Sequence, residues 1–283
     1  MSVKERAPAK VNLGLRITGK RADGYHNILS IFQTVELYDE LHMTVSPESG
    51  LSCDHPDVPQ NAENLILKAE DILRTRHDIT SRVHFRLTKR IPVGGGLGGG
   101  SSDAAAAIRG LKTLYGLDIS DIVLMKYGEE LGFDVPFLLR GGTAVVSGRG
   151  ERVEFVSWPF DFTYVIVYPN FGISTAWAYS NLDWPTDDPD AYQSMTVKLK
   201  AGTLDSGKFF DVLRNDFEGV VFQKYPVLKE IKALLTHHGA RTAILTGSGS
   251  SMLGIFEEEK DAQLCTQSLK SSFSSVFIVK AHT

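Results

Sequence analysis

A run of six glycines among seven residues, Gly94 to Gly100, constrains this 283-residue chain more than any other feature. An ordered glycine costs roughly 0.5–1 kcal/mol relative to alanine, so such a run is expected where the backbone must approach another group closely. The alternating segment 83–87 precedes the run and predicts a strand. The alanine-rich segment 101–114 follows it and predicts a helix. The run therefore leads from a strand into a helix N-terminus.

This position favours a phosphate-binding loop. Backbone N–H groups at a helix N-terminus lack partners within the helix and carry about half a positive charge, which suits phosphate oxygens. The hydroxyls of Ser101 and Ser102 can add hydrogen bonds or reach a metal ion. No Gly-Lys-Ser/Thr follows, which excludes a Walker A loop, and no first βαβ unit precedes, which argues against a dinucleotide fingerprint. A flexible linker is the alternative, although Gly/Ser linkers do not usually join a strand to an alanine-rich helix.

Length and composition indicate a globular protein of two domains. Apolar residues make up 42% and charged residues 23% of the chain, which allows a packed core. We expect a boundary near Gly150, with an N-terminal domain over 1–150 and a C-terminal domain over 151–283. The order of strands and helices predicts the α+β class. The net charge of -4 argues against general nucleic-acid binding, which needs a basic face.

The sequence also gives expectations for the protein's location and oligomeric state. No run of about 18 apolar residues predicts a membrane span, and the N-terminus has no apolar signal core. Cys53 and Cys265 lie far apart without zinc spacing, which suggests two reduced thiols. We expect a cytoplasmic protein that is a monomer or a weak homodimer.

The rest of the chain predicts alternating strands and helices. Segment 181–206 is polar and contains Pro185 and Pro189, so it predicts a loop or an insertion. Helical spacing favours helices over 62–74, 120–131, 220–235 and 260–273. Strands are expected over 9–18, 28–37, 141–146, 152–156, 162–168, 243–245 and 252–256, with a turn at 20–26.

The glycine run in its context resembles the phosphate loop of the GHMP kinases, a family that includes galactokinase, homoserine kinase and mevalonate kinase. Two further segments resemble this family's signatures and occur in its order, 7–13 and 245–251. The resemblance implies ATP as phosphoryl donor with Mg²⁺ to neutralise its phosphates. It also implies an N-terminal domain like ribosomal protein S5 domain 2 and a C-terminal α/β-plait-like domain. The ATP-binding residues it implies are Pro92, Val93, Gly94, Gly95, Gly96, Leu97, Gly98, Gly99, Gly100, Ser101, Ser102 and Asn64.

Segments 10–13, 19–26 and 132–137 resemble members of this family that act in the non-mevalonate isoprenoid pathway. Those members transfer the γ-phosphoryl group of ATP to the 2-hydroxyl of a cytidine diphospho-polyol. The resemblance implies that Asp134 is the catalytic base, which orients the hydroxyl and takes its proton late. It implies that Lys10 is the matching cation, which could keep Asp134 ionised and stabilise charge on the migrating group.

The same resemblance implies a set of substrate-binding residues. Tyr25 could stack on the cytosine, and His26 could pair with its polar edge. Asn12 could bond the polyol or the catalytic centre. The other candidates are Thr175, Gly247 and Ser248. A core-packed tyrosine, a helix-capping Asn64 and a plain tight turn at 246–251 are the structural alternatives.

Three alternatives to this function stay open. The chain could be another GHMP-type kinase with a different acceptor, although the Tyr25-His26 pair argues against it. It could be a catalytically inactive nucleotide-binding regulator, although both Lys10 and Asp134 are present. It could also be a non-enzymatic binding domain with a glycine linker. No acidic metal motif is visible, so the ligands of Mg²⁺ stay open.

Overall fold

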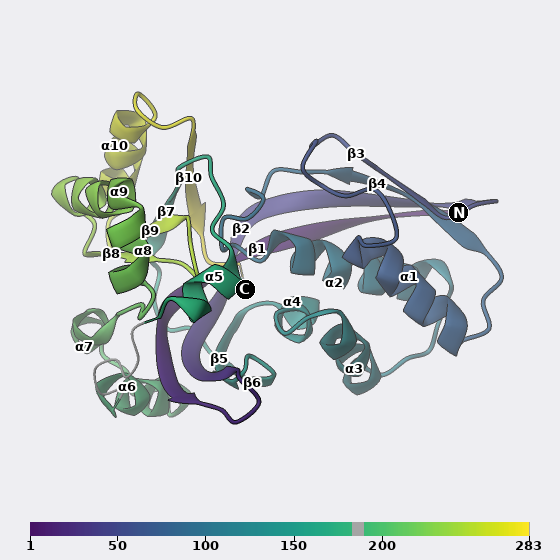
Figure 1. The fold of residues 1–283 in the computed structure, drawn as a ribbon, viewed down its shortest axis with the longest axis horizontal. Coiled ribbons are helices and arrows are strands. Elements are labelled where there is room, and N and C mark those ends of the chain that lie inside the picture. Colours follow the sequence, from purple (N-terminus) through teal and green to yellow (C-terminus); the bar gives the residue numbers. More distant parts are fainter. Residues whose placement is uncertain (183–189, 283) are drawn as a thin grey trace. The chain divides into compact units, whose positions relative to one another are not determined.

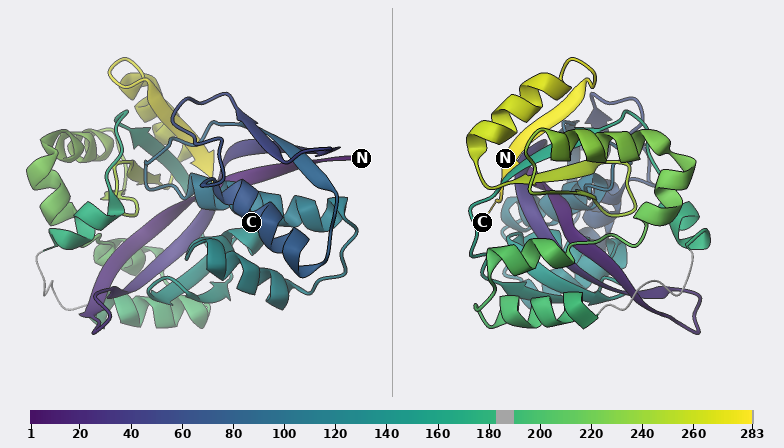
Figure 2. Two further views of the ribbon diagram at one scale, coloured as in Figure 1. Left: turned by 45° about the vertical axis from the view of Figure 1, so that its right-hand side comes forward. Right: turned by 90° about the vertical axis from the view of Figure 1, so that its left-hand side faces the viewer.

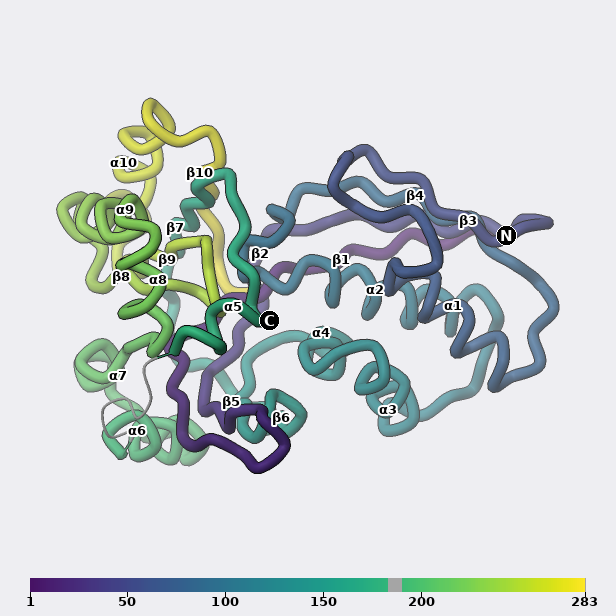
Figure 3. Tube along the Cα trace, in the orientation of Figure 1, coloured from purple at the N-terminus to yellow at the C-terminus, as the bar shows by residue number. Residues whose placement is uncertain are grey.

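The computed structural model describes residues 1–182 and 190–282. Two compact units are each assembled from several segments of the chain. The first contains Met1–Ala9, Leu37–Val93 and Gly98–Gly141, and the second contains Lys10–Glu36, Gly94–Leu97 and Gly142–Thr283. The long strands β1 (Ser2–Lys20) and β2 (His26–Ser46) pair with each other and contribute to both units, as the chain trace in Figure 3 shows. Because each unit takes segments from several parts of the chain, this division does not test a single boundary near Gly150. The domains 1–150 and 151–283 stay a prediction.

The first unit combines a sheet with helices that lie beside it (Figure 1). β3 (Gly50–Cys53) pairs in parallel with β4 (Arg82–Thr88), and β4 pairs antiparallel with residues 40–46 of β2. Every second residue of β4 is buried, as the alternation in the sequence predicts. The helices are α1 (Leu65–Arg76), α2 (Gly99–Leu114), α3 (Asp121–Leu131) and α4 (Val135–Arg140). The start of α2 is thereby held in a packed helical layer.

The second unit is built on an antiparallel sheet in the order β10–β7–β9–β8. Its strands are β7 (Thr163–Tyr168), β8 (Thr242–Leu245), β9 (Met252–Phe256) and β10 (Ser275–Lys280). This sheet shares one apolar core with the helices α5 (Thr175–Ser180), α8 (Glu218–Lys224), α9 (Pro226–His237) and α10 (Glu259–Leu269). Figure 2 shows α10 lying along β10. A hairpin of β5 (Thr143–Gly148) and β6 (Arg152–Val156) pairs with residues 28–33 of β2.

The α+β prediction is confirmed, and two of the predicted segments are wrong in detail. One helix was expected over 220–235, but α8 ends at Lys224 and α9 begins at Pro226. Tyr225 between them has a φ of -126° and a ψ of 73°, outside the helical region, because a residue that precedes proline is disfavoured there. Several short elements have no counterpart among the predictions: β3, β10, α4, α5 (Thr175–Ser180) and α7 (Ser206–Val212).

A loop or an insertion was expected over 181–206, and the loop is wrong over residues 190–200, which form α6 (Asp190–Lys200). Residues 183–189 of that segment lie outside the described residues. α6 buries Tyr192, Met195, Thr196 and Leu199, the spacing of an amphipathic helix. The Tyr192 hydroxyl donates to the Leu13 carbonyl at 2.5 Å and accepts from the Ile31 N–H at 3.1 Å. A polar-looking segment is therefore part of the packing around β1 and β2.

Replacing Gly14 by alanine is expected to destabilise the protein by about 3 kcal/mol, from backbone strain and overpacking together. Gly14 has a φ of +87°, and a Cβ atom there would lie 2.4 Å from the Tyr192 ring. Gly116 is the matched control, because its φ is +64° but nothing lies within 4 Å of its Cβ position. Denaturant unfolding should find Gly116→Ala clearly milder; equal losses would contradict the packing of α6 on β1.

No helix among the described residues combines the length and apolarity that crossing a membrane needs.

Candidate active site

Within the second unit, the glycine run packs against the small-residue turn that follows β8. The Ser251 N–H donates to the Gly95 carbonyl at 3.1 Å. Gly96 has a φ of +76°, and a Cβ atom there would lie 2.4 Å from the Thr246 carbonyl oxygen. Gly247, with a φ of +59°, faces the Gly96 carbonyl oxygen in turn. Gly96 and Gly247 are therefore required by backbone-to-backbone contact inside the protein, whatever ligand the loop binds.

Lys10 and Asn12 lie on the same face of β1, two residues apart, in this same unit. The Lys10 ammonium donates to the Asn12 Oδ1 atom at 2.8 Å and lies 4.3 Å from the centroid of the Phe32 ring. Both side chains are buried, with 5% and 1% of their residues' surface exposed. A buried cation with an amide and a ring as neighbours is costly to desolvate, so such an arrangement is a candidate for chemistry on an anionic group.

The turn at 246–248 connects to this cation through hydrogen bonds. The Asn12 N–H donates to Thr246 Oγ1 at 3.0 Å, and the Asn12 Nδ2 group donates to Ser30 Oγ at 2.9 Å. Ser248 Oγ lies 2.9 Å from Thr175 Oγ1, within hydrogen-bonding distance, at the start of α5. The structure therefore places Lys10, Asn12, Thr175 and the turn with Gly247 and Ser248 in one network of the second unit.

Asn215 holds this turn in place and was not singled out from the sequence. Its Nδ2 group donates to the carbonyls of Leu245 and Gly247 at 2.7 and 2.8 Å, and its Oδ1 atom accepts from the Phe217 N–H. Asn215 is 4% exposed, so its amide is committed to these backbone groups. No local pattern indicates this role, because the partners lie some thirty residues further along the chain.

His26 and Tyr25 follow the tight turn between β1 and β2. The His26 ring stacks on the Tyr179 ring of α5, with centroids 5.3 Å apart and planes 18° apart. Tyr179 meets Phe217 edge-on. Burial and, to a lesser extent, the charge of Lys20 lower the pKa of His26, so its ring is neutral at pH 7. Tyr25 is 53% exposed, with the Arg149 guanidinium 5.4 Å from its ring centroid. Tyr179 is a site candidate that only the fold reveals.

In the first unit, α2 begins with a backbone arrangement suited to an anion. Its N-cap is Gly98, with a φ of +69°, and no side chain of the described residues caps this end. The Ser102 N–H donates to the Gly98 carbonyl, and its hydroxyl donates to the Pro8 carbonyl at 2.6 Å. Ser102 is fully buried, whereas Ser101 is half-buried. The first N–H groups of α2 and the Ser101 hydroxyl are therefore the better donors for a phosphate.

Asp134 and Asn64 both occupy N-cap positions in the first unit, with different consequences. Asn64 accepts from the Ile66 N–H at 2.9 Å and donates to the Pro59 carbonyl at 2.7 Å, so both ends of its amide hold the start of α1. Its implied role in ATP binding stays a prediction. Asp134 precedes α4, is half-buried and makes no capping hydrogen bond with its carboxylate in the described chain. That carboxylate is not committed to the helix end.

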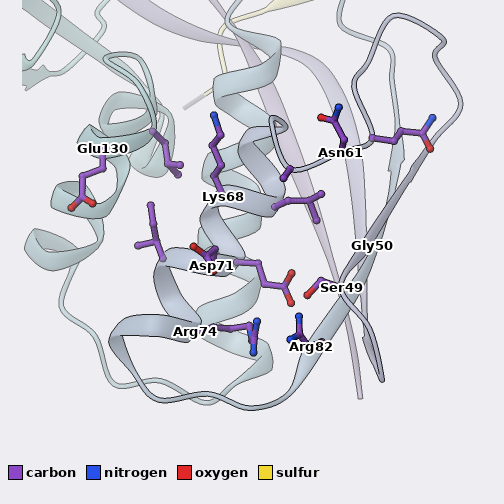
Figure 4. A pocket seen from close by; sticks show the side chains of 14 residues that line it. Ser49, Gly50, Asn61, Lys68, Asp71, Arg74, Arg82 and Glu130 are labelled. Atoms are coloured by element: carbon purple, nitrogen blue, oxygen red, sulfur yellow. The ribbon is translucent and has the colours of Figure 1, made fainter.

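The first unit also contains an open pocket of about 670 Å³ beside α1, seen close up in Figure 4. Its charged lining combines Lys68, Arg74 and Arg82 with Glu70, Asp71 and Glu130. None of the predicted catalytic, ATP-binding or substrate-binding residues lines it. The predicted site and this pocket are therefore separate features.

Over residues 1–182 and 190–282, no three histidine, cysteine or acidic side chains gather in a way that could hold a metal ion.

Comparison with known proteins gives the family context of this geometry. The family description "GHMP kinases N terminal domain" matches residues 64–142, and "GHMP kinases C terminal" matches residues 204–275. A relative from Prosthecochloris aestuarii is 39% identical over 98% of this chain and 96% of its own length. A relative from Chlorobium phaeobacteroides is 41% identical over 96% of this chain and 95% of its own. Both are named 4-diphosphocytidyl-2-C-methyl-D-erythritol kinase.

Solved structures with the same fold agree with this result. The crystal structure of a 4-(cytidine 5'-diphospho)-2C-methyl-D-erythritol kinase matches 99% of this chain and 100% of its own, with a TM-score of 0.82 and 31% identity. A homoserine kinase from Cytophaga hutchinsonii matches 100% of this chain and 94% of its own, with a TM-score of 0.78 and 21% identity. The second likeness shows the fold alone. The predicted two-domain GHMP kinase fold is confirmed.

Proposed function

The chain belongs to the GHMP kinases, and from this premise we propose that it transfers the γ-phosphoryl group of ATP to the 2-hydroxyl of 4-diphosphocytidyl-2-C-methyl-D-erythritol. The products are the 2-phosphate and ADP, a step of isoprenoid precursor synthesis by the non-mevalonate route. One observation carries the proposal: relatives 36–41% identical over at least 95% of this chain share the name of that kinase. A cytoplasmic monomer or weak homodimer that acts on small molecules fits this activity.

The donor side of the reaction rests on backbone groups. We infer that the N–H groups at the start of α2 hold the phosphates of ATP, because a helix N-terminus attracts anions. The uncapped end after Gly98 and the accessible Ser101 hydroxyl support this assignment. Magnesium, when bound with the nucleotide, neutralises phosphate charge. The protein's own part is to orient the phosphates and to keep the loop in shape.

The acceptor side rests on side chains with separate tasks. We infer that Asp134 orients the 2-hydroxyl and takes its proton as the new P–O bond forms, since a free alcohol is far too weak an acid to lose its proton beforehand. Lys10 stabilises the charge on the phosphoryl oxygens, and Asn12 supports its orientation through the 2.8 Å hydrogen bond. The neutral His26 ring can donate and accept at the edge of cytosine, with Tyr25 as an aromatic surface.

Substrate conversion tests this proposal directly. The protein is incubated with Mg–ATP and 4-diphosphocytidyl-2-C-methyl-D-erythritol, and phosphorus-31 NMR is used to look for the 2-phosphate and ADP. Homoserine, mevalonate and galactose in parallel reactions represent other acceptors within the family. We expect product only with the cytidine substrate. Turnover with another alcohol would indicate a different GHMP-type kinase, and tight ATP binding without any turnover would indicate a nucleotide-binding regulator.

Tyr179→Ala is expected to raise the KM for the cytidine substrate about tenfold, because His26 would no longer be held in place to bond the cytosine edge, and tenfold corresponds to roughly one hydrogen bond. The substitution removes the ring on which His26 is stacked. Steady-state kinetics should show a KM for ATP within twofold of the original value. Tyr179→Phe keeps the ring and is the control, so its KM should stay near that of the unsubstituted enzyme. If the alanine and phenylalanine variants behaved alike, the His26–Tyr179 stack would have no part in substrate binding.

A further inference from the structure

The first unit contains a buried ion cluster of Asp39, Lys89 and Asp103 that the proposed chemistry does not use. Lys89 donates to the carboxylate of Asp39 and, at 2.8 Å, to Asp103 Oδ2. The exposed fractions of the three side chains are 0–5%. A fully buried cation between two carboxylates is costly to assemble, and it is weak support for stability alone. Its position relative to the glycine run suggests a task.

The buried ion cluster joins the two ends of the glycine run. Lys89 directly follows β4 and precedes residues 90–93, which lead into the run. Asp103 lies in the first turns of α2, which begins at Gly99 within the run. On the leading side, Asp39 Oδ1 accepts from the N–H groups of Arg90 and Ile91 at 2.6 and 2.8 Å. One carboxylate of β2 therefore fixes the backbone before the run, and one cation connects it to the helix after the run.

The start of α2 lies against the buried ion cluster, and Asp103 has a specific environment there. A Cβ atom at Gly99 would lie 3.0 Å from Lys89 Nζ and 3.1 Å from Ile91 Cγ2, so the helix start lies against the cation. Asp103 Oδ1 is buried and has no hydrogen-bond partner among the described residues. Burial raises the pKa of Asp103 to about 7, although the charge of Lys89 acts in the opposite direction. A neutral side chain that keeps the acceptor oxygen is therefore compatible with this position.

We propose that Asp39, Lys89 and Asp103 are positioning residues that set the spacing between the two ends of the phosphate loop and thereby the affinity for ATP. The inference rests on the proposed function, in which this loop holds the nucleotide. A loop whose ends are fixed loses less freedom when it binds, and this preorganisation appears as affinity. The acceptor has no contact with the buried ion cluster in this scheme. Loosening the buried ion cluster should therefore weaken the binding of ATP and leave the binding of the cytidine substrate unchanged.

Titration calorimetry with Mg–ATP, together with steady-state kinetics, tests the proposal on three variants. Asp103→Leu removes one of the two carboxylates to which Lys89 donates and so breaks its link to α2. It should raise the Kd for ATP about tenfold, with the KM for the cytidine substrate within twofold. Asp103→Asn keeps an acceptor oxygen and should restore ATP affinity to within twofold. Glu70→Leu is the control: Glu70 is a buried acid of the same unit that accepts from the Val83 N–H. It should lower the Tm without changing the Kd for ATP.

If Asp103→Leu does not fold, the triple variant Asp39→Asn, Lys89→Met, Asp103→Leu removes all three charges together, a change that proteins often tolerate better than breaking a buried ion pair. The amide oxygen at position 39 can still accept from the N–H groups of Arg90 and Ile91. The triple variant should show the same loss of ATP affinity. Unchanged ATP affinity in Asp103→Leu or in the variant that replaces it, equal losses for both substrates, or an Asp103→Asn variant as weak as Asp103→Leu would each overturn the proposal. Failure of the proposed function is distinguishable, because the unsubstituted protein would then bind ATP without phosphorylating the cytidine substrate.

Discussion

Asp134→Asn is expected to lower kcat by about 10²–10⁴-fold, the range that a positioned general base contributes. The amide has the shape of the carboxylate but cannot accept the proton of the 2-hydroxyl. Because the Asp134 carboxylate makes no capping hydrogen bond to α4, the substitution should leave the start of this helix unchanged. The KM for ATP should stay within twofold. Initial rates of ADP release at saturating substrates, with product identified by phosphorus-31 NMR, measure the effect.

The control for this prediction is the same substitution at another helix start of the same unit. Asp121 is the exposed first residue of α3, and its contact with Lys112 is long, at 4.0 Å. Asp121→Asn should keep kcat within twofold, because a surface ion pair contributes little. An Asp134→Asn enzyme that retained more than about a fifth of normal turnover would exclude Asp134 as the base, because even modest general-base catalysis exceeds tenfold.

The fold was predictable where its signal is local. The alternation in 83–87 and the alanine-rich segment 101–114 correspond to β4 and α2, since side-chain periodicity is a property of neighbours in sequence. Pro226 is a local signal too, because proline is typical of the first position of a helix. It indicates that one helix ends before it and that another, α9, begins at it. α6 was missed for another reason. Its apolar face is completed by contacts with β1 and β2, which lie more than 150 residues earlier in the chain.

In the candidate site, too, residues whose partners lie far away in the chain could not be predicted from the sequence. The glycine run was found from composition, yet the need for Gly96 comes from the turn at 246–249, which no local pattern connects to it. Lys89 and its two carboxylates look like solvated charges in the sequence, and only the fold buries them together. Tyr179 likewise becomes a candidate through its stacking on His26. The roles of Lys10 and Asp134 came from resemblance, and kinetics of their variants are what can test them.

Lys10→Met is expected to lower kcat by about 10²–10³-fold, the loss seen when one donor to a developing negative charge is removed. Methionine fills the space against Phe32 with a flexible apolar chain but offers no charge to the phosphoryl oxygens. Asn12 loses one partner and keeps its bonds to Thr246 and Ser30, so destabilisation of about 1 kcal/mol is expected. Thermal unfolding and turnover, measured on the same preparation, separate the two effects.

A lysine of the same strand provides the comparison that assigns the loss to chemistry. Lys4 lies on β1, is 63% exposed and pairs with Glu40 at 2.8 Å. Lys4→Met removes the same charge from the same strand and should keep kcat within twofold, since an exposed ion pair is worth about 0–1 kcal/mol. If both variants lost activity in proportion to their loss of stability, Lys10 would be structural. A loss confined to kcat of the Lys10 variant requires its ammonium in the transition state, because binding and folding are then unchanged.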